Sequence, residues 1–155
     1  MKPKICLVSS PGGHLFHLIK LKSWWSKYPH FWVTKNSLDS NTMIGKNEKI
    51  YYANFPEQRN MVNFIKNLIL AINIIYKEKP NIIISSGAGV APPFFIIGKL
   101  LGSKLIFVEI YDFIKYPTLS GKLVYPFTNL FIVQHKKQLK SYPKATMVGS
   151  ILWSI

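Results

Sequence analysis

The stretch SSPGGHLFHL, residues 9–18, has the composition of a ligand-binding loop, and it directly follows the apolar run ICLV. Gly12 and Gly13 permit a tight turn and close approach of the backbone, and a helix that begins there offers free N–H groups to an anion. His14 can take up a proton near neutral pH, which makes it the candidate catalytic base. The G-x-G-x-x-G spacing of a dinucleotide-binding loop is absent, and a plain strand-to-helix turn is the competing interpretation.

A second loop of small residues follows another predicted strand. Residues 85–93 read SSGAGVAPP, so the prolines can open the next helix. Two such loops at one edge of a sheet can hold a diphosphate through their backbone amides. The residues that we expect to contact this ligand are Ser10, Gly12 and Gly13 in the first loop and Ser86, Gly87, Ala88 and Gly89 in the second.

A third loop carries acidic residues, of which the chain has only six. Glu109 and Asp112 follow the apolar run LIFV, and a carboxylate that comes directly after buried residues needs a partner. We predict that Glu109 accepts hydrogen bonds from sugar hydroxyls of the ligand, and the alternative is that it caps nearby backbone amides. His17, one helical turn after His14, could face the same ligand, although nothing in the sequence ties it to the loop.

These loops need a scaffold, and the pattern of elements predicts one. Short β-branched runs are expected as strands at 4–9, 30–34, 49–53, 81–85, 104–109, 130–134 and 145–148. Helical patterns lie between them at 15–28, 61–79, 93–101 and 119–126. Several strand runs are apolar on both faces, which is typical of a parallel sheet covered by helices on both sides. We therefore expect one Rossmann-like domain over residues 1–155, an α/β fold with a doubly wound parallel sheet and its ligand loops at the carboxyl ends of the strands.

Composition limits the partners that this domain can have. The 155 residues include 20 basic and six acidic ones, a formal net charge of +14, and Arg59 is the only arginine. A lysine-rich surface suits anionic lipid headgroups or anionic small substrates, and compositional drift is the alternative. The lack of arginine and of any recognised binding motif argues against a nucleic-acid-binding protein.

Cysteine usage and hydropathy give the expected location. The single cysteine, Cys6, excludes an internal disulfide and a thiolate metal cluster, and no residue pattern calls for a metal or another cofactor. No signal-peptide pattern and no run near the ~18 apolar residues of a membrane span occurs. We expect a cytoplasmic protein whose contact with a membrane is peripheral.

Several apolar segments are candidates for that contact. The helical pattern at 61–79 is apolar over most of its circumference, so it is either a core helix or a docking helix. We expect Trp24, Phe94, Phe95 and Trp153 to meet a membrane or a protein partner. Trp24 and its neighbour Trp25 point about 100° apart on a helix, so one of the two is expected in the core.

Four stretches in this order carry a family resemblance that covers nearly the whole chain: SSPGGHLFHL, PNIIISSGAGVAPPFFIIGKLLGSKLIFVE, PTLSGKLVYP and FIVQHKKQLKSYPKATMVGSI. The chain resembles the smaller, acceptor-side subunit of two-component glycosyltransferases that build capsular polysaccharides and exopolysaccharides (PssD/CpsF-like). It is also similar to their eukaryotic relative, which anchors the enzyme that adds the second N-acetylglucosamine to dolichol-linked oligosaccharide.

The resemblance implies one half of a GT-B glycosyltransferase, similar to the N-terminal lobe of the lipid I N-acetylglucosaminyltransferase of peptidoglycan synthesis. The loops around His14 and Gly87 would then face the diphosphate and sugar of an undecaprenyl-diphosphate-linked saccharide. A separate donor-binding subunit would complete a heterodimer at the inner face of the cell membrane, where the apolar residues 151–155 are expected to dock on it. Alone, the subunit would transfer little sugar or none.

The sequence departs from the family pattern at three places. Phe113 stands where an arginine often follows the glutamate, and Lys115 is the nearest residue that could replace its charge. His135 replaces an aromatic residue. The amino-terminal membrane helix of the eukaryotic form is missing, so we expect attachment through surface patches or a partner. A non-catalytic scaffold that only recruits the transferase is the alternative function.

Overall fold

The computed structural model describes residues 2–57 and 59–152, and in this part of the chain seven parallel strands form one sheet in the order β3-β2-β1-β4-β5-β6-β7. This order is the doubly wound arrangement that the sequence predicts. The strands are β1 (Ile5–Ser9), β2 (His30–Thr34), β3 (Ile50–Tyr52), β4 (Ile82–Gly87), β5 (Lys104–Val108), β6 (Leu130–Val133) and β7 (Thr146–Met147).

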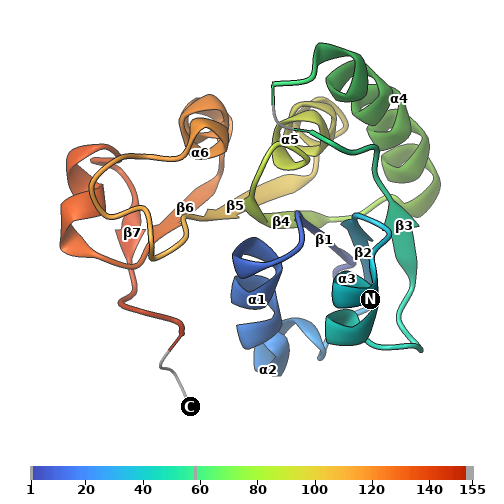
Figure 1. The fold of residues 1–155 in the computed structure, drawn as a ribbon, viewed down its shortest axis with the longest axis horizontal. Helices are drawn as coiled ribbons and strands as arrows, with labels where there is room; N and C mark the ends of the chain where they lie inside the picture. The colour runs from blue at the N-terminus through green and yellow to red at the C-terminus, as the bar shows by residue number, and fades with distance from the viewer. Residues whose placement is uncertain (1, 58, 153–155) are drawn as a thin grey trace.

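Helices cover both faces of the sheet (Figure 1). One face carries α1 (Gly13–Lys20), α2 (Lys22–Trp25) and α3 (Leu38–Ile44), and the other carries α4 (Met61–Glu78), α5 (Ala91–Leu100) and α6 (Leu119–Val124). Two short 3₁₀ helices, η1 (Tyr125–Phe127) and η2 (Lys136–Lys140), flank β6.

Successive side chains of a strand point to opposite faces of the sheet, and this produces two hydrophobic cores. In β1, Cys6 and Val8 join the core under α4 and α5, whereas Ile5 and Leu7 join the core under α1 to α3. All four side chains are fully buried, which explains why the run is apolar on both faces. The Cys6 thiol is accordingly a small apolar core group.

The two glycine-rich loops lie at the switch point of the sheet. After β1 the chain winds outward to β2 and β3, returns through α4 and enters β4 directly beside β1. The connections that leave β1 and β4 run in opposite directions from neighbouring strands, and this opens a crevice at their carboxyl ends.

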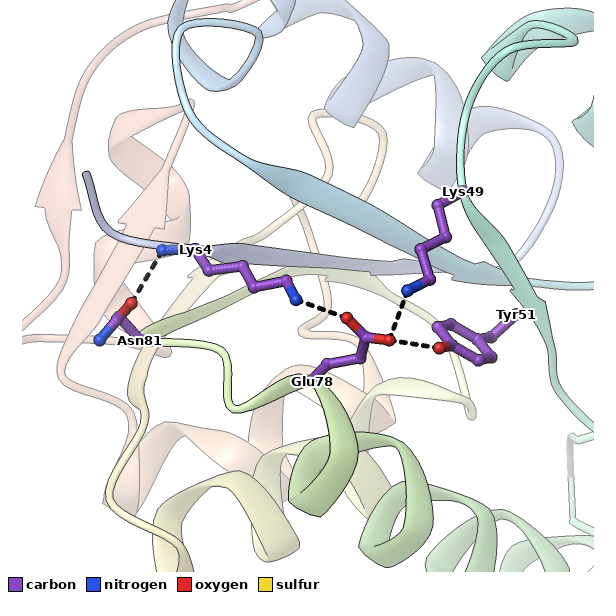
Figure 2. Close-up of polar contacts among 5 residues, drawn as sticks. All are labelled: Lys4, Lys49, Tyr51, Glu78 and Asn81. Carbon is purple, nitrogen blue, oxygen red and sulfur yellow. Dashed lines mark hydrogen bonds and ion pairs between the residues drawn. The ribbon is translucent and has the colours of Figure 1, made fainter. Parts of the chain in front are cut away.

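At the edge of the sheet opposite the crevice, a buried carboxylate joins the end of α4 to the starts of β1 and β3 (Figure 2). The carboxylate of Glu78 lies 2.5 Å from Lys4 Nζ and 2.6 Å from Lys49 Nζ, and it accepts a hydrogen bond from the hydroxyl of Tyr51. The backbone N–H of Lys4 donates to Asn81 Oδ1 at 2.8 Å. Burial alone would raise the pKa of Glu78, but the three donors outweigh it and lower the pKa to about 2.

The expected helix at 15–28 is two helices, because the chain turns at Leu21 between α1 and α2. Trp25 is buried and its indole N–H donates to the carbonyl of Leu18 at 2.7 Å, while Trp24 is half-buried. One of the two tryptophans therefore lies in the core, as the sequence predicts. The helix α3 was not predicted, and only Ser40 and Ile44 of its residues are buried.

The expectation that Phe94 and Phe95 meet a membrane or a partner is wrong. Both side chains are fully buried, because α5 contacts the sheet below it and the helices α4 and α6 on its two sides. Gly98 allows this close packing, since a Cβ there would lie 2.3 Å from Ile83 Cδ1. Trp153 and the rest of 153–155 lie outside the described residues.

Candidate functional site

His14 stands at the start of α1, beside the loop that follows β4. Its Nδ1 lies 2.6 Å from the backbone oxygen of Ser86. A carbonyl oxygen can only accept, so Nδ1 carries the proton and Nε2 presents a lone pair. Burial lowers the pKa of His14 from its ordinary value of 6.5, although the Ser86 carbonyl and the charges of Glu57 and Asp112 act in the opposite direction. The ring is therefore a neutral proton acceptor at neutral pH.

The loop after β4 fixes the orientation of this ring. The hydroxyl of Ser86 donates to the carbonyl of His14 at 2.5 Å, so the two residues are joined twice. Gly87 has φ +109°, and a Cβ at this position would lie 2.8 Å from His14 Cε1. Glycine is required here because a side chain would push the imidazole out of place.

A chain of hydrogen bonds connects three loops on the other side of the site. The hydroxyl of Ser10 donates to Glu57 Oε1 at 2.6 Å and accepts from the N–H of Ala88 at 3.2 Å. The N–H of Ser10 donates to the carbonyl of Gly87 at 3.1 Å. The loops after β1, β3 and β4 are thus held together before any ligand arrives.

The backbone amides of the two glycine-rich loops differ in availability. Gly12 and Gly13 are exposed, and no side chain caps the first turn of α1. In the second loop the N–H of Gly87 donates to Ser85 Oγ at 2.9 Å, and that of Ala88 donates to Ser10. The first loop therefore offers free donors to an anion, whereas these two amides of the second loop already have acceptors.

These loops border a groove of about 510 Å³. One wall carries His14, Ala88, Gly89 and Pro92, the second comes from the segment before and within α4, and the third from the loop before α6 and from α6 itself. The second wall contributes Glu57, Arg59, Asn60, Met61 and Phe64, and the third contributes Phe113, Pro117, Thr118, Leu119, Ser120 and Leu123. The groove therefore combines a proton acceptor, a carboxylate, an arginine and an apolar rim.

The prediction that Glu109 contacts the ligand is wrong, because this side chain is fully buried. Its Oε2 accepts from the hydroxyls of Tyr142 at 2.6 Å and Thr118 at 3.0 Å, and backbone N–H groups of Thr118 and Ile110 complete the shell. Burial raises the pKa of Glu109, although these hydrogen bonds act in the opposite direction. Burial and the hydrogen bond to the Glu109 carboxylate raise the pKa of Tyr142. The capping alternative is therefore correct: Glu109 holds the start of α6, which lines the groove.

His17 has a structural role that the sequence did not reveal. Its Nδ1 lies 2.7 Å from the carbonyl of Gly13, and its Nε2 accepts from the N–H of Tyr111 at 3.4 Å. The imidazole is buried and both nitrogens are used, so it joins the first loop to the third.

Glu57 and Arg59 are the groove residues that sequence reasoning missed. They lie in an irregular segment that no motif marks, and the crossover from β3 to α4 brings them beside His14. The available signal was the scarcity of acids together with the position of Glu57 just after a strand of the sheet. No group of three His, Cys, Asp or Glu side chains suited to a metal ion occurs within residues 2–57 and 59–152.

Comparison with solved structures identifies the fold. Acinetobacter baumannii MurG superposes with a TM-score of 0.79 at 16% identity, over 97% of this chain and 46% of that one. The UDP-GlcNAc 2-epimerase of Methanocaldococcus jannaschii gives a TM-score of 0.73 at 16% identity, over 95% and 45%. Each likeness covers about half of the larger chain, as expected for one lobe of a GT-B enzyme, and the predicted fold class is confirmed.

Comparison of sequences identifies relatives. The chain is 28% identical over 133 residues to the UDP-N-acetylglucosamine transferase subunit alg14 of Schizosaccharomyces pombe, over 77% of this chain and 63% of that protein. It is 29% identical over 94 residues to the human subunit ALG14, over 57% and 44%. The UDP-N-acetylglucosamine–N-acetylmuramyl-(pentapeptide) pyrophosphoryl-undecaprenol N-acetylglucosamine transferase of Borreliella burgdorferi is 27% identical over 158 residues, over 90% and 42%.

The chain thus spans roughly half of the curated relatives that it matches. A family model, "Oligosaccharide biosynthesis protein Alg14 like", matches residues 5–151, which include both glycine-rich loops and every wall of the groove. The chain belongs to the Alg14-like family of oligosaccharide biosynthesis proteins.

Proposed function

We propose that this chain is the acceptor-binding subunit of a two-component glycosyltransferase, in which a separate subunit binds the nucleotide sugar. The observation that carries the proposal is His14, which lines a groove able to hold a saccharide and whose Nδ1–H donates to the Ser86 carbonyl, so that Nε2 keeps its lone pair. The relatives named as UDP-N-acetylglucosamine transferase subunits support the transferase class.

The proposed reaction needs one base in this subunit. A hydroxyl oxygen of the acceptor attacks the anomeric carbon of the donor sugar, and its proton passes to Nε2 of His14. The bond between that carbon and the nucleoside diphosphate breaks, and its electron pair leaves with the diphosphate. A positioned base of this kind contributes about 10² to 10⁴ in rate.

The acceptor is proposed to be a lipid-diphosphate-linked saccharide. Its diphosphate would lie on the uncapped first turn of α1 at Gly12 and Gly13, where N–H groups and the helix dipole favour negative charge. The groove rim is apolar, since Met61, Leu119 and Leu123 line it and are exposed, and this suits the first units of a polyprenyl chain.

Attachment to a membrane is proposed through α4 rather than α5. An exposed apolar face runs along α4, from Met61 at 71% exposure to Tyr76 at 72%. The other residues of this face, which we call the α4 face, are Val62, Ile65, Ile69 and Ile72. Lys66 and Lys77 beside it are exposed, as an anionic lipid surface requires. No helix in the described part of the chain is long and apolar enough to span a bilayer.

The biological setting extends this proposal. The acceptor is then an undecaprenyl-diphosphate-linked saccharide at the inner face of the cell membrane. The product is destined for capsular polysaccharide or exopolysaccharide. A groove that borders the α4 face is consistent with both.

The experiment is sugar transfer to undecaprenyl-diphosphate-linked sugar in membranes that contain this chain, its donor-binding partner, or both. We expect strong transfer only with both, and a loss of at least about a hundredfold in the pair when His14→Ala removes the base. Equal transfer by the partner alone would refute the proposal that this chain is a required half of the transferase. Transfer within twofold of wild type for His14→Ala would leave the non-catalytic scaffold, the second candidate function.

A further inference from the structure

The carboxylate of Glu57 is placed in the groove with one oxygen held and the other available. Oε1 accepts from Ser10 at 2.6 Å, while Oε2 has no hydrogen-bond partner within residues 2–57 and 59–152. Glu57 also forms no ion pair with any described basic residue, although the chain carries 20 basic residues. An acid that a strongly basic protein leaves without a basic partner in a groove is available to a ligand.

The segment that carries Glu57 is firmly anchored. Buried Asn67 on α4 accepts from the N–H of Asn54 at 2.8 Å and donates to its carbonyl at 3.1 Å. Asn63 donates to the carbonyl of Pro56 at 2.8 Å. Glu57 packs so closely on Gly89 that a Cβ there would lie 2.6 Å from its Cγ. The position of the carboxylate is therefore set by the fold.

The charge of Glu57 decides which part of an acceptor this end of the groove can take. A diphosphate beside it would meet the negative charge of Glu57, which pairs with no described basic residue, and the nearby amides of Gly87 and Ala88 already have acceptors. A sugar, in contrast, offers hydroxyl groups. Hydrogen bonds from a hydroxyl to a carboxylate are short and strong, because the acceptor is ionised.

We propose that Glu57 is the residue that recognises the acceptor sugar: Oε2 accepts from a hydroxyl of the terminal sugar and orients it toward Nε2 of His14, while the negative charge directs the diphosphate to the first loop. This inference rests on the proposed acceptor-binding function and assigns the sugar to a residue of that same groove. Ser10, which donates to Oε1, acts as the positioning residue for this carboxylate.

The test compares the binding of a sugar-free ligand and of sugar-bearing ligands to this chain. The probes are farnesyl diphosphate and farnesyl diphosphate linked to glucose, galactose or N-acetylglucosamine, titrated by calorimetry. We expect wild type to bind one of the sugar-bearing probes more tightly than the sugar-free one. Glu57→Gln should weaken that probe about tenfold or more, as loss of a hydrogen bond to a charged group does, and should leave farnesyl diphosphate bound no more weakly.

A matched control variant separates the outcomes. Glu48→Gln makes the same change of charge where Glu48 pairs with His30, 2.8 Å apart, at the opposite edge of the sheet, and it should change neither affinity. Equal weakening of both probes by Glu57→Gln, or no weakening, overturns the inference, as does a wild type that binds no sugar-bearing probe better than farnesyl diphosphate. A wild type that binds none of the probes instead refutes the proposed acceptor-binding function itself.

Discussion

At the scale of single residues, the chemistry open to His14 depends on which of its ring nitrogens carries the proton. The Ser86 carbonyl fixes that proton on Nδ1, and burial keeps the ring neutral at neutral pH. A protonated ring would have no lone pair for an acceptor hydroxyl. The surroundings of His14 thus favour the form that a general base needs.

Gly87 is the residue whose substitution tests this placement most directly. Gly87→Ala should reduce transfer by the complete enzyme at least tenfold, because its Cβ would meet His14 Cε1 at 2.8 Å and displace the ring. Gly102→Ala is the control, since Gly102 also has a positive φ, +86°, but nothing lies within 4 Å of the added Cβ. Similar loss of activity in both variants would show that backbone strain, and not the position of His14, is responsible.

Sequence reasoning located some of these residues and misplaced others for a physical reason. His14 and Gly87 lie side by side, as two glycine-rich loops after neighbouring strands predict, and their contact with a ligand stays a prediction. Glu109 was assigned to the ligand because a carboxylate after a buried strand needs a partner, but the partners, Tyr142 and Thr118, come from distant parts of the chain. Glu57 was missed because its role depends on Ser10, 47 residues away in sequence.

At the scale of elements, Glu78 ties the end of α4 to Lys4 and Lys49, which lead into β1 and β3. Its pKa falls from the ordinary 4.5 to about 2, so its contribution is present above about pH 4.5 and is lost as the pH falls toward 2. Glu78→Gln should lower the free energy of unfolding by about 3 kcal/mol at pH 7, with the difference from wild type shrinking between pH 4.5 and 2.

Urea unfolding followed by circular dichroism at several pH values measures this difference. Asp39→Asn serves as the control, because Asp39 is exposed on α3, and it should change stability little at any of these pH values. A difference for Glu78→Gln that stays constant from pH 7 to pH 2 would mean that lost packing, and not the ionised carboxylate, causes the loss.

The elements themselves were predictable where the apolar pattern was strong. All seven expected strands are present with small changes at their ends, and the pattern was clearest in runs buried on both faces, as in β1 and β4. The helix α3 was missed because LDSNTMI has no apolar stripe, and Ser37 stabilises its start by accepting from the N–H of Ser40. The turn at Leu21 was missed because the apolar pattern continues across it.

At the scale of the whole molecule, one side of the domain combines the groove with the α4 face. Met61 belongs to both, since it lines the groove and begins the exposed apolar row. The proposed lipid-linked acceptor would therefore keep its chain at the membrane that the α4 face is proposed to contact, while its sugar extends to His14.

The α4 face should govern binding to vesicles. Replacing Ile65 and Ile69 together by Asn should weaken binding to phosphatidylglycerol-containing vesicles about tenfold or more, because two half-exposed apolar side chains no longer leave water on binding. Leu38→Asn on α3, whose side chain is 85% exposed on the other face of the sheet, should have no such effect. Vesicle sedimentation measures both, and equal binding by the double variant would exclude the α4 face as the contact.

The pairing of β1 with β4 also has a consequence for the order of events during synthesis. His14 leaves the ribosome long before Ser86, which stands 72 residues later, and the strands that bracket the groove become neighbours only when β4 is complete. A nascent chain that stops before β4 carries the histidine without the carbonyl that directs its proton. The contact between His14 and Ser86 therefore forms only after β4 has been synthesised and lies beside β1. The third wall of the groove, at residues 113–123, follows later still, so the groove is complete only when most of the chain has left the ribosome.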